Sequence, residues 1–154
     1  MDGPRATTVL FVHGAHLAGW CWLLVMDQLA RLGIESHAID LPLTGYADDV
    51  ESVRAAIGAA RSRWGPVHVV CHSYAGLPVA EAGHAAAHLT FVAGRLPLAV
   101  VCADDRAVRP EAQRERAALV GASIELDTDH SPFFSGPAAL AGFIAGRHRA
   151  MACP

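Results

Sequence analysis

Polar side chains that could react together stand after three apolar, strand-like runs of the chain. Ser73 follows the run 67–71, Asp104 and Asp105 follow a second run, and His130 lies shortly after a third. In open α/β sheets the carboxyl ends of the strands meet at one edge, which is where reactive groups gather. A hydroxyl, a carboxylate and an imidazole that meet there are suited to nucleophilic and acid–base chemistry.

The surroundings of Ser73 predict a sharp turn from strand to helix. Small residues flank the serine, with Cys71 two positions before it and Ala75 and Gly76 after it. Such a turn is strained, and bulky side chains would clash with the adjacent strand and helix. A lone serine at a strand end is more often a turn residue or a helix N-cap. The catalytic interpretation therefore depends on the aspartate and the histidine that follow in the chain.

Strand-like and helical segments alternate along the chain, and these elements must position the polar groups. The expected strands are 8–12, 34–41, 67–71, 98–102 and 123–126. The expected helices are 20–32, 48–63, 75–87, 110–120 and 137–148. Such alternation predicts the α/β class, with a mostly parallel sheet of about five or six strands flanked by helices. A chain of 154 residues fits a single domain, 1–154.

The composition is that of a packed domain. Hydrophobic residues make up 53% and charged residues 18%, which excludes global disorder. All 12 basic residues are scattered arginines and the formal net charge is -3, so we expect no nucleic-acid partner. The chain lacks both the run of about 20 apolar residues that a membrane-spanning helix needs and a signal-peptide pattern. We therefore expect no membrane association and a cytoplasmic location.

Cysteine and histidine spacing does not predict a metal site. The cysteines lack paired spacing and are expected to be free thiols; they are Cys21, Cys71, Cys102 and Cys153. His84 and His88 have the i, i+4 spacing used by zinc-binding helices, but only alanines lie between them. We interpret this pair as a solvated helix end and expect neither a metal nor another cofactor.

Several motifs together resemble the α/β-hydrolase superfamily, and within it the methylesterase and hydroxynitrile lyase subfamily. The G-x-S-x-G elbow of that superfamily is matched at 71–75, where Cys71 and Ala75 replace two glycines. The elbow alone would be a weak signal, but the combination of motifs is specific and covers nearly the whole chain. The other matching segments are 11–22 (FVHGAHLAGWCW), 38–42 (AIDLP), 102–108 (CADDRAV) and 129–132 (DHSP).

The resemblance implies a catalytic triad. Ser73 would be the nucleophile, His130 would accept its proton and return it to the leaving group, and Asp105 would orient the imidazole. Asp104 competes for the acid position, but the family acid directly precedes the Arg-Ala-Val type of segment, so Asp104 is interpreted as a solvated neighbour. Asp129 would be a surface or loop-capping carboxylate.

The resemblance also implies how a substrate would be held. The backbone N–H groups of Ala15 and Tyr74 would form the oxyanion hole. Without a cap, an open apolar cleft would be lined by Leu17, Trp20 and Phe133, together with Tyr74. His13 and His72 match family positions, and we expect them to have a local structural role.

The chain departs from the family between the strand that matches 91–93 and the strand at 98–102. Family members carry a helical cap and a crossover helix there, whereas here only Gly94 to Pro97 separate the strands. Because a parallel crossover ordinarily needs a dozen or more residues, we expect that these two strands are not parallel neighbours in one chain.

Three alternatives would keep the triad. Residues 88–97 could be a plain connection that places 98–102 beside the serine strand, the C-terminal half could be exchanged between two chains, or a cap segment could be missing from the sequence. One face of the sheet near 98–102 would then lack its usual cover, which predicts a homodimer.

The function expected from these residues is that of a carboxylesterase-type serine hydrolase that cleaves small esters through an acyl-enzyme. A lyase or another non-hydrolytic enzyme of the same fold is the first alternative. In the lyase branch a threonine replaces the glycine of the His-Gly pair and a lysine follows the catalytic histidine, whereas here these positions are Gly14 and Ser131. A degenerate hydrolase that only binds a ligand is the second alternative.

Overall fold

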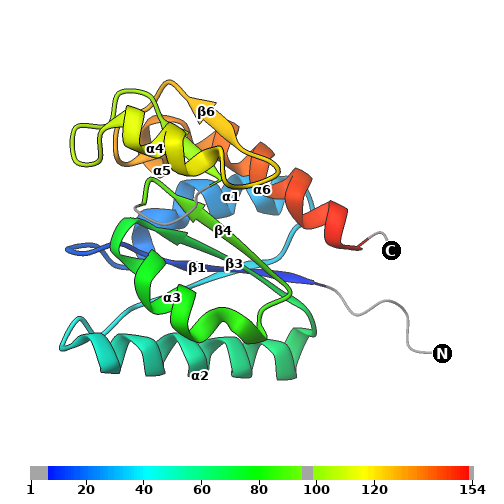
Figure 1. Cartoon of the computed structure of the whole chain (residues 1–154). Coiled ribbons are helices and arrows are strands. Elements are labelled where there is room, and N and C mark those ends of the chain that lie inside the picture. Colours follow the sequence, from blue (N-terminus) through cyan, green and yellow to red (C-terminus); the bar gives the residue numbers. More distant parts are fainter. Residues whose placement is uncertain (1–6, 95–98, 153–154) are drawn as a thin grey trace.

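The computed structural model describes residues 7–94 and 99–152, and it confirms the predicted α/β class. Six strands form one sheet in the order β2-β1-β3-β4-β5-β6, and every neighbouring pair is parallel (Figure 1). The strands are β1 (Thr8–Val12), β2 (Ser36–Ile39), β3 (Val67–His72), β4 (His88–Val92), β5 (Val100–Cys102) and β6 (Ile124–Leu126).

Helices cover both faces of this sheet, as the alternation of segments predicted. The α-helices are α1 (Leu23–Arg31), α2 (Tyr46–Trp64), α3 (Gly76–Ala82), α4 (Pro110–Ala117), α5 (Pro132–Ser135) and α6 (Pro137–Ala152). Three short 3₁₀ turns are η1 (Gly19–Trp22), η2 (Ser73–Ala75) and η3 (Gly83–Ala85). Helices α1 and α6 pack side by side over one face, and α2 and α3 pack over the other (Figure 1).

The two halves of the core follow from the alternation of side chains along the central strands. Val9 and Phe11 of β1 face α1 and α6, where Phe11 stacks on Trp22 with ring centroids 4.6 Å apart. Leu10 and Val12 point to the opposite face and pack against α2 and α3. Because β1 is buried on both faces, its sequence is a continuous apolar run.

Local signals account for the ends of the helices. Helix α1 stops at the expected place, because Gly33 adopts a φ of 75°, which a glycine reaches without strain. The long helix α2 carries acidic residues in its first turn and arginines in its last, which complements the helix dipole. Pro78 lies in the first turn of α3, where no intrahelical N–H bond is lost.

The connection between β4 and β5 shows that one expectation was wrong. Val92, the last residue of β4, pairs in parallel with Val100, the first residue of β5. The N–H of Ala99 donates to the carbonyl of Phe91 at 3.0 Å, and that of Ala93 donates to Val100 at 3.2 Å. Strand β5 begins beside the end of β4 and continues in the same direction. No crossover back to the start of β4 is required.

This register excludes one of the three alternatives. Strand β4, and not β5, is the neighbour of β3, so 88–97 is not a plain connection that places 98–102 next to the serine strand. Of the predicted strand 98–102, Leu98 lies outside the described residues, as does the 95–97 part of the connection. Chain exchange and a missing cap segment stay untested.

The sheet face near β5 is covered within one chain. Val100, Val101 and Cys102 are all buried, and Val101 packs with Ala117 of α4 and with Phe91. The homodimer stays a prediction, but the uncovered face that suggested it is not present in the described part of β5.

The helix predicted for 75–87 ends earlier than expected, which changes the interpretation of its histidines. The α-helix stops at Ala82 and the following 3₁₀ turn at Ala85, so His84 is in the turn and His88 begins β4. The two histidines therefore do not share a helix face, and the i, i+4 pairing was wrong. Among the described residues, none of the helices is long and apolar enough to cross a membrane.

Candidate active site

Ser73, His130 and Asp105 form one chain of hydrogen bonds at the carboxyl edge of the sheet. The Nδ1 atom of His130 lies 2.7 Å from Oδ2 of Asp105, and its Nε2 atom lies 3.0 Å from Oγ of Ser73. Because an ionised carboxylate only accepts, Nδ1 carries the proton and Nε2 is left to accept from the serine hydroxyl. This is the geometry in which the imidazole can take the serine proton.

The turn that carries Ser73 is strained, as its sequence predicted. Ser73 has a φ of 50°, in the left-handed region that non-glycine residues seldom adopt. It follows β3 directly and leads through η2 into α3, so its side chain stands at the end of a buried strand. Strain of this kind, of the order of 1–3 kcal/mol, concentrates at functional sites where the surrounding structure holds it in place.

The loop after β1 contacts the end of β3 closely at Gly14. A Cβ atom built on Gly14 would lie 2.7 Å from Nδ1 of His72 and 3.3 Å from the His72 carbonyl oxygen. No side chain fits at position 14 without moving one of these atoms. The glycine therefore allows the loop after β1 to approach the end of β3, which brings together the segments that carry Ala15 and Tyr74.

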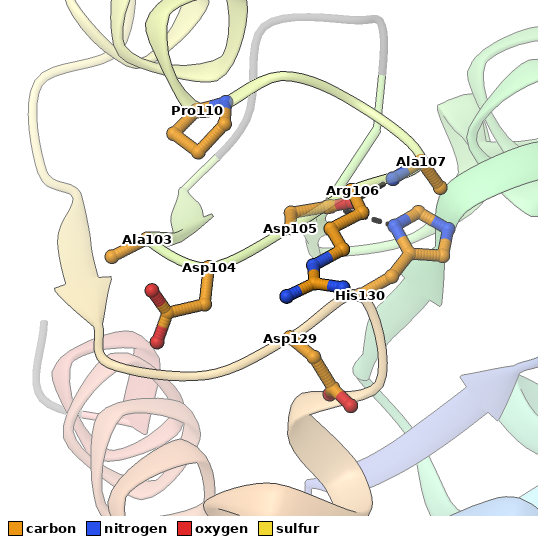
Figure 2. Close-up of a pocket in the computed structure, with 8 residues that line it drawn as sticks. All are labelled: Ala103, Asp104, Asp105, Arg106, Ala107, Pro110, Asp129 and His130. Atoms are coloured by element: carbon orange, nitrogen blue, oxygen red, sulfur yellow. Dashed lines mark hydrogen bonds and ion pairs between the residues drawn. The ribbon is translucent and has the colours of Figure 1, made fainter.

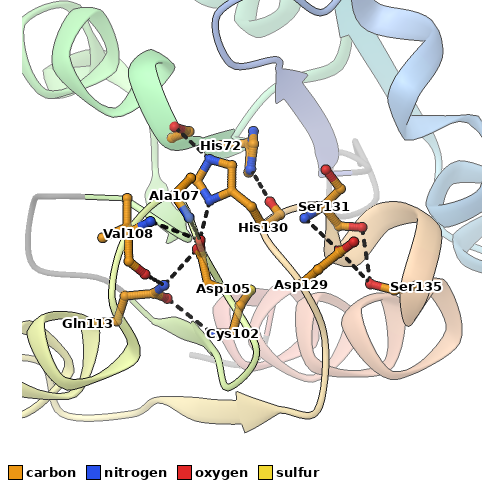
Figure 3. A network of polar contacts seen from close by, with 11 residues as sticks. His72, Cys102, Asp105, Ala107, Val108, Gln113, Asp129, His130, Ser131 and Ser135 are labelled. Carbon is orange, nitrogen blue, oxygen red and sulfur yellow. Dashed lines mark hydrogen bonds and ion pairs between the residues drawn. The ribbon is translucent and has the colours of Figure 1, made fainter.

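His72 and His13 have the local structural roles that we expected. The Nε2–H group of His72 donates to the backbone carbonyl of His130 at 2.6 Å, which ties the end of β3 to the histidine loop (Figure 3). Burial lowers the pKa of His72 to about 4, so its ring is neutral at pH 7. His13 accepts from the N–H of Leu41 at 2.9 Å and contacts the carbonyl of Gly14 at 2.8 Å, which joins two loops.

Asp105 and Asp104 lie in very different surroundings. Asp105 is 4% exposed, and its Oδ1 atom accepts from the N–H groups of Ala107 and Val108 at 2.7 and 2.8 Å. Asp104 is exposed, and its carboxylate points away from the imidazole of His130 (Figure 2). The structure thus places Asp105, and not its neighbour, against the histidine.

A wide, open cavity of about 1010 Å³ lies on the outer side of this pair (Figure 2). His130 and Asp105 form part of its wall, together with the exposed side chains of Asp104, Arg106 and Asp129. Asp129 accepts from the N–H of Ser131 at 2.9 Å, which is the loop-capping role that we expected for it.

Ala15 and Tyr74, the residue that follows Ser73, line a smaller cavity of about 320 Å³. Asp49, a buried carboxylate that is 1% exposed, anchors one wall, where its Oδ2 atom accepts from the Tyr74 hydroxyl at 2.6 Å. This hydrogen bond raises the pKa of Tyr74 to about 12. The Oδ1 atom of Asp49 accepts from the N–H of Leu43 at 2.9 Å, so one carboxylate joins the loop before α2 to the serine turn.

The apolar residues expected around the cleft fall into two groups. Trp20 is 57% exposed and stacks on Phe134, which is 44% exposed, with ring centroids 5.8 Å apart. Leu17 is half-buried against the core. Phe133 is fully buried between Trp22 and the other rings, so the prediction that it lines the cleft was wrong. The ring of Phe133 packs edge-on against the ring of His72, with centroids 4.9 Å apart. Phe134, and not Phe133, is the exposed phenylalanine.

Two polar residues of the site were missed by sequence reasoning. Gln113 is fully buried and hydrogen-bonds Asp105 from α4, and Asp49 holds Tyr74 from α2. Each lies on a helix among polar neighbours, in segments that look like ordinary solvated helix faces. Their burial and their hydrogen-bond partners in the folded chain identify them.

The thiols Cys21, Cys71 and Cys102 are free and buried, as expected, while Cys153 lies outside the described residues. Burial raises the pKa of all three thiols, to about 12 for Cys21 and about 11 for Cys102. Cys71 hydrogen-bonds the carbonyl of Thr90 and faces the core, although it stands only two residues before Ser73.

Known proteins with the same architecture were found by sequence and by structure. A family model described as alpha/beta hydrolase family matches residues 9–100. Comparison with curated protein sequences gives no significant match.

Three solved structures illustrate the likeness in fold. A pyrethroid hydrolase from Sphingobium faniae JZ-2 has a TM-score of 0.79 at 16% identity, over 94% of this chain and 98% of that one. Polyneuridine aldehyde esterase has a TM-score of 0.80 at 13% identity, over 93% and 99%. Tomato methylketone synthase I, complexed with 2-tridecanone, has a TM-score of 0.79 at 12% identity, over 95% and 99%. Because the family model matches more than half of the chain, the chain belongs to the alpha/beta hydrolase family.

Proposed function

We propose that this chain is a serine hydrolase of the carboxylesterase type that cleaves small esters through an acyl-enzyme. The observation that carries the proposal is the hydrogen-bonded chain from Ser73 through His130 to Asp105, with distances of 3.0 and 2.7 Å. The exposed edge of the site and the solved esterase and hydrolase of the same fold support a small-molecule ester as substrate.

The proposed reaction begins with attack of Ser73 Oγ on the ester carbonyl carbon, while Nε2 of His130 takes the hydroxyl proton. The buried carboxylate of Asp105 stabilises the imidazolium that forms. His130 then gives the proton to the alcohol oxygen as the C–O bond breaks, which leaves the acyl group on Ser73. Water attacks the acyl-enzyme by the same route, and the carboxylic acid is released.

The developing oxyanion would be stabilised by the backbone N–H groups of Ala15 and Tyr74. Both residues line the same 320 Å³ cavity, and the close contact of Gly14 with His72 brings their segments together. Loss of one such donor typically lowers the rate about a hundredfold or more.

Hydrolysis is better supported than the lyase alternative. The lyase branch has a threonine where this chain has Gly14, and any side chain there would meet His72 Nδ1 at 2.7 Å. The position after His130 holds Ser131 and not lysine. A cytoplasmic location belongs to the same proposal, because the three described thiols are unpaired, as is usual in a reducing compartment.

Labelling with a fluorophosphonate tests the proposal and separates it from the binding-module alternative. We expect the folded protein to form a covalent adduct whose mass maps to Ser73, and we expect Ser73→Ala and His130→Ala to lose the label. Ser36→Ala, on β2 at the far edge of the sheet, is the matched control and should label like the wild type. Folded wild-type protein that forms no adduct would favour a chain that only binds ligands.

A further inference from the structure

A side chain outside the sequence motifs contacts the proposed catalytic acid. Gln113 lies on α4 and is 0% exposed. A buried amide is costly unless its hydrogen bonds are satisfied. The Nε2 group of Gln113 donates to Asp105 Oδ2 and to the carbonyl of Val108, both at 2.7 Å, and its Oε1 atom accepts from the N–H of Cys102 at 3.0 Å (Figure 3).

The two backbone partners decide which way this amide points. The N–H of Cys102 can only donate and the carbonyl of Val108 can only accept. If the amide of Gln113 were turned over, a donor would face the N–H and an acceptor would face the carbonyl. The NH₂ group is therefore held toward Asp105 by bonds that do not involve Asp105 at all.

This arrangement fills the acceptor sites of the carboxylate. A carboxylate has about four lone-pair sites, and Asp105 receives four hydrogen bonds. Two backbone N–H groups bind Oδ1, while Gln113 and His130 share Oδ2. Gln113 thus contacts the same oxygen atom that accepts the proton-bearing nitrogen of the imidazole.

We propose that Gln113 is a positioning residue, whose fixed amide holds Oδ2 of Asp105 where it accepts the Nδ1–H of His130. The inference rests on the proposed function, because the position of this oxygen matters for rate only if His130 acts as the base. Without this amide, the carboxylate would be freer to turn away from the imidazole.

Gln113→Met tests the role of the amide, because methionine is also unbranched and about as long but offers no hydrogen bond to the carboxylate. With p-nitrophenyl acetate as substrate, we expect kcat to fall about 10- to 100-fold with KM nearly unchanged. The chain offers a matched control in its only other glutamine, and Gln28→Met on α1 should keep wild-type kinetics.

A spectroscopic readout separates this inference from the proposed function. The Nδ1 proton of His130 should give a low-field proton NMR resonance, identified by its loss in His130→Gln. In Gln113→Met we expect this resonance to move upfield or to broaden by exchange, whether or not the wild type hydrolyses the ester. A wild type without esterase activity and without fluorophosphonate labelling would refute the proposed function, while the resonance would still decide the role of Gln113.

Gln113→Glu separates positioning from packing. When protonated, this glutamic acid can still donate to Asp105, but when ionised it places a second carboxylate against the first. We therefore expect its activity relative to the wild type to fall steadily as the pH rises. A folded Gln113→Met protein with the wild-type resonance and a folded Gln113→Glu protein with the wild-type pH profile would show that Gln113 only packs α4 and would overturn the inference.

Discussion

Lowering the pH should lower the free energy of unfolding, and protonation of His68 should account for a large part of that decrease. This histidine is fully buried on β3, 2.8 Å from the Thr90 hydroxyl through Nε2, with no partner for its Nδ1 atom within the described part of the chain. Its ring stacks on His148 and lies 4.9 Å from His88 between centroids. Burial, reinforced by these histidines and by Arg147, lowers the pKa of His68 from 6.5 to about 3.

The size and direction of the effect follow from this pKa. Between pH 6.5 and 3 the unfolded chain binds a proton at His68 that the folded chain does not bind, so stability falls as the pH falls. The contribution is complete above pH 6.5 and is lost as the pH drops toward 3. At pH 4.5 the loss is about 3 kcal/mol, at about 1.4 kcal/mol per pH unit. This is a large part of the roughly 5–15 kcal/mol that stabilises a typical domain.

Urea unfolding at pH 7 and at pH 4.5, followed by tryptophan fluorescence, measures the loss directly. We expect His68→Gln to lose about 3 kcal/mol less between the two pH values than the wild type, because glutamine does not titrate. His72 titrates in the same window, so some pH dependence should remain. His37→Gln is the matched control, because the His37 side chain is 39% exposed, beside Glu35 and Trp64.

Equal losses for the wild type and His68→Gln would refute the reasoning. They would mean that the buried imidazole accepts a proton in the folded chain as readily as in the unfolded one. A reduced loss in His37→Gln of the same size would have the same consequence, because burial could then not be the cause.

Three further predictions concern the site. Asp105→Asn should lower ester turnover by about 10⁴-fold, as loss of the orienting acid does in other triads. Asp104→Asn should change kcat less than twofold, and the reverse ranking would assign the acid role to Asp104. Gly14→Thr should strongly lower the rate of fluorophosphonate labelling, because the new side chain would clash with His72. Labelling at the wild-type rate would show that the structure accommodates a side chain at position 14. Iodoacetamide at pH 8 should leave the buried thiols of Cys21, Cys71 and Cys102 unmodified in the folded protein. Rapid modification of these thiols, measured by peptide mass, would contradict their burial.

The part of the fold that was predictable is the part that local patterns encode. Five of the six strands were predicted, and β1, β3 and β5 have the largely apolar sequences that parallel strands buried on both faces require. The segments that carry Ser73, Asp105 and His130 were found for a related reason. Each lies shortly after a predicted strand, and all parallel strands end at the same edge of the sheet.

The β4–β5 step was not predictable from loop length alone. The rule that a parallel connection needs a dozen residues assumes that the second strand starts level with the first. Here β5 starts where β4 stops, with Val92 opposite Val100, and this offset is a property of the register. The sequence carries no local sign of it.

By itself, the sequence determined the class of fold, the order of most elements and the three segments whose residue types and order suit nucleophilic catalysis. Only the tertiary structure decided which carboxylate meets His130, that Phe133 lies beneath the site, and that Gln113 and Asp49 are buried beside it. The physical reason is that periodicity and chain order are local properties, whereas burial and hydrogen bonding depend on which distant segments come into contact. In the sequence Gln113 resembles a surface residue of α4, whereas in the folded chain β5 and the loop that carries Asp105 bury it.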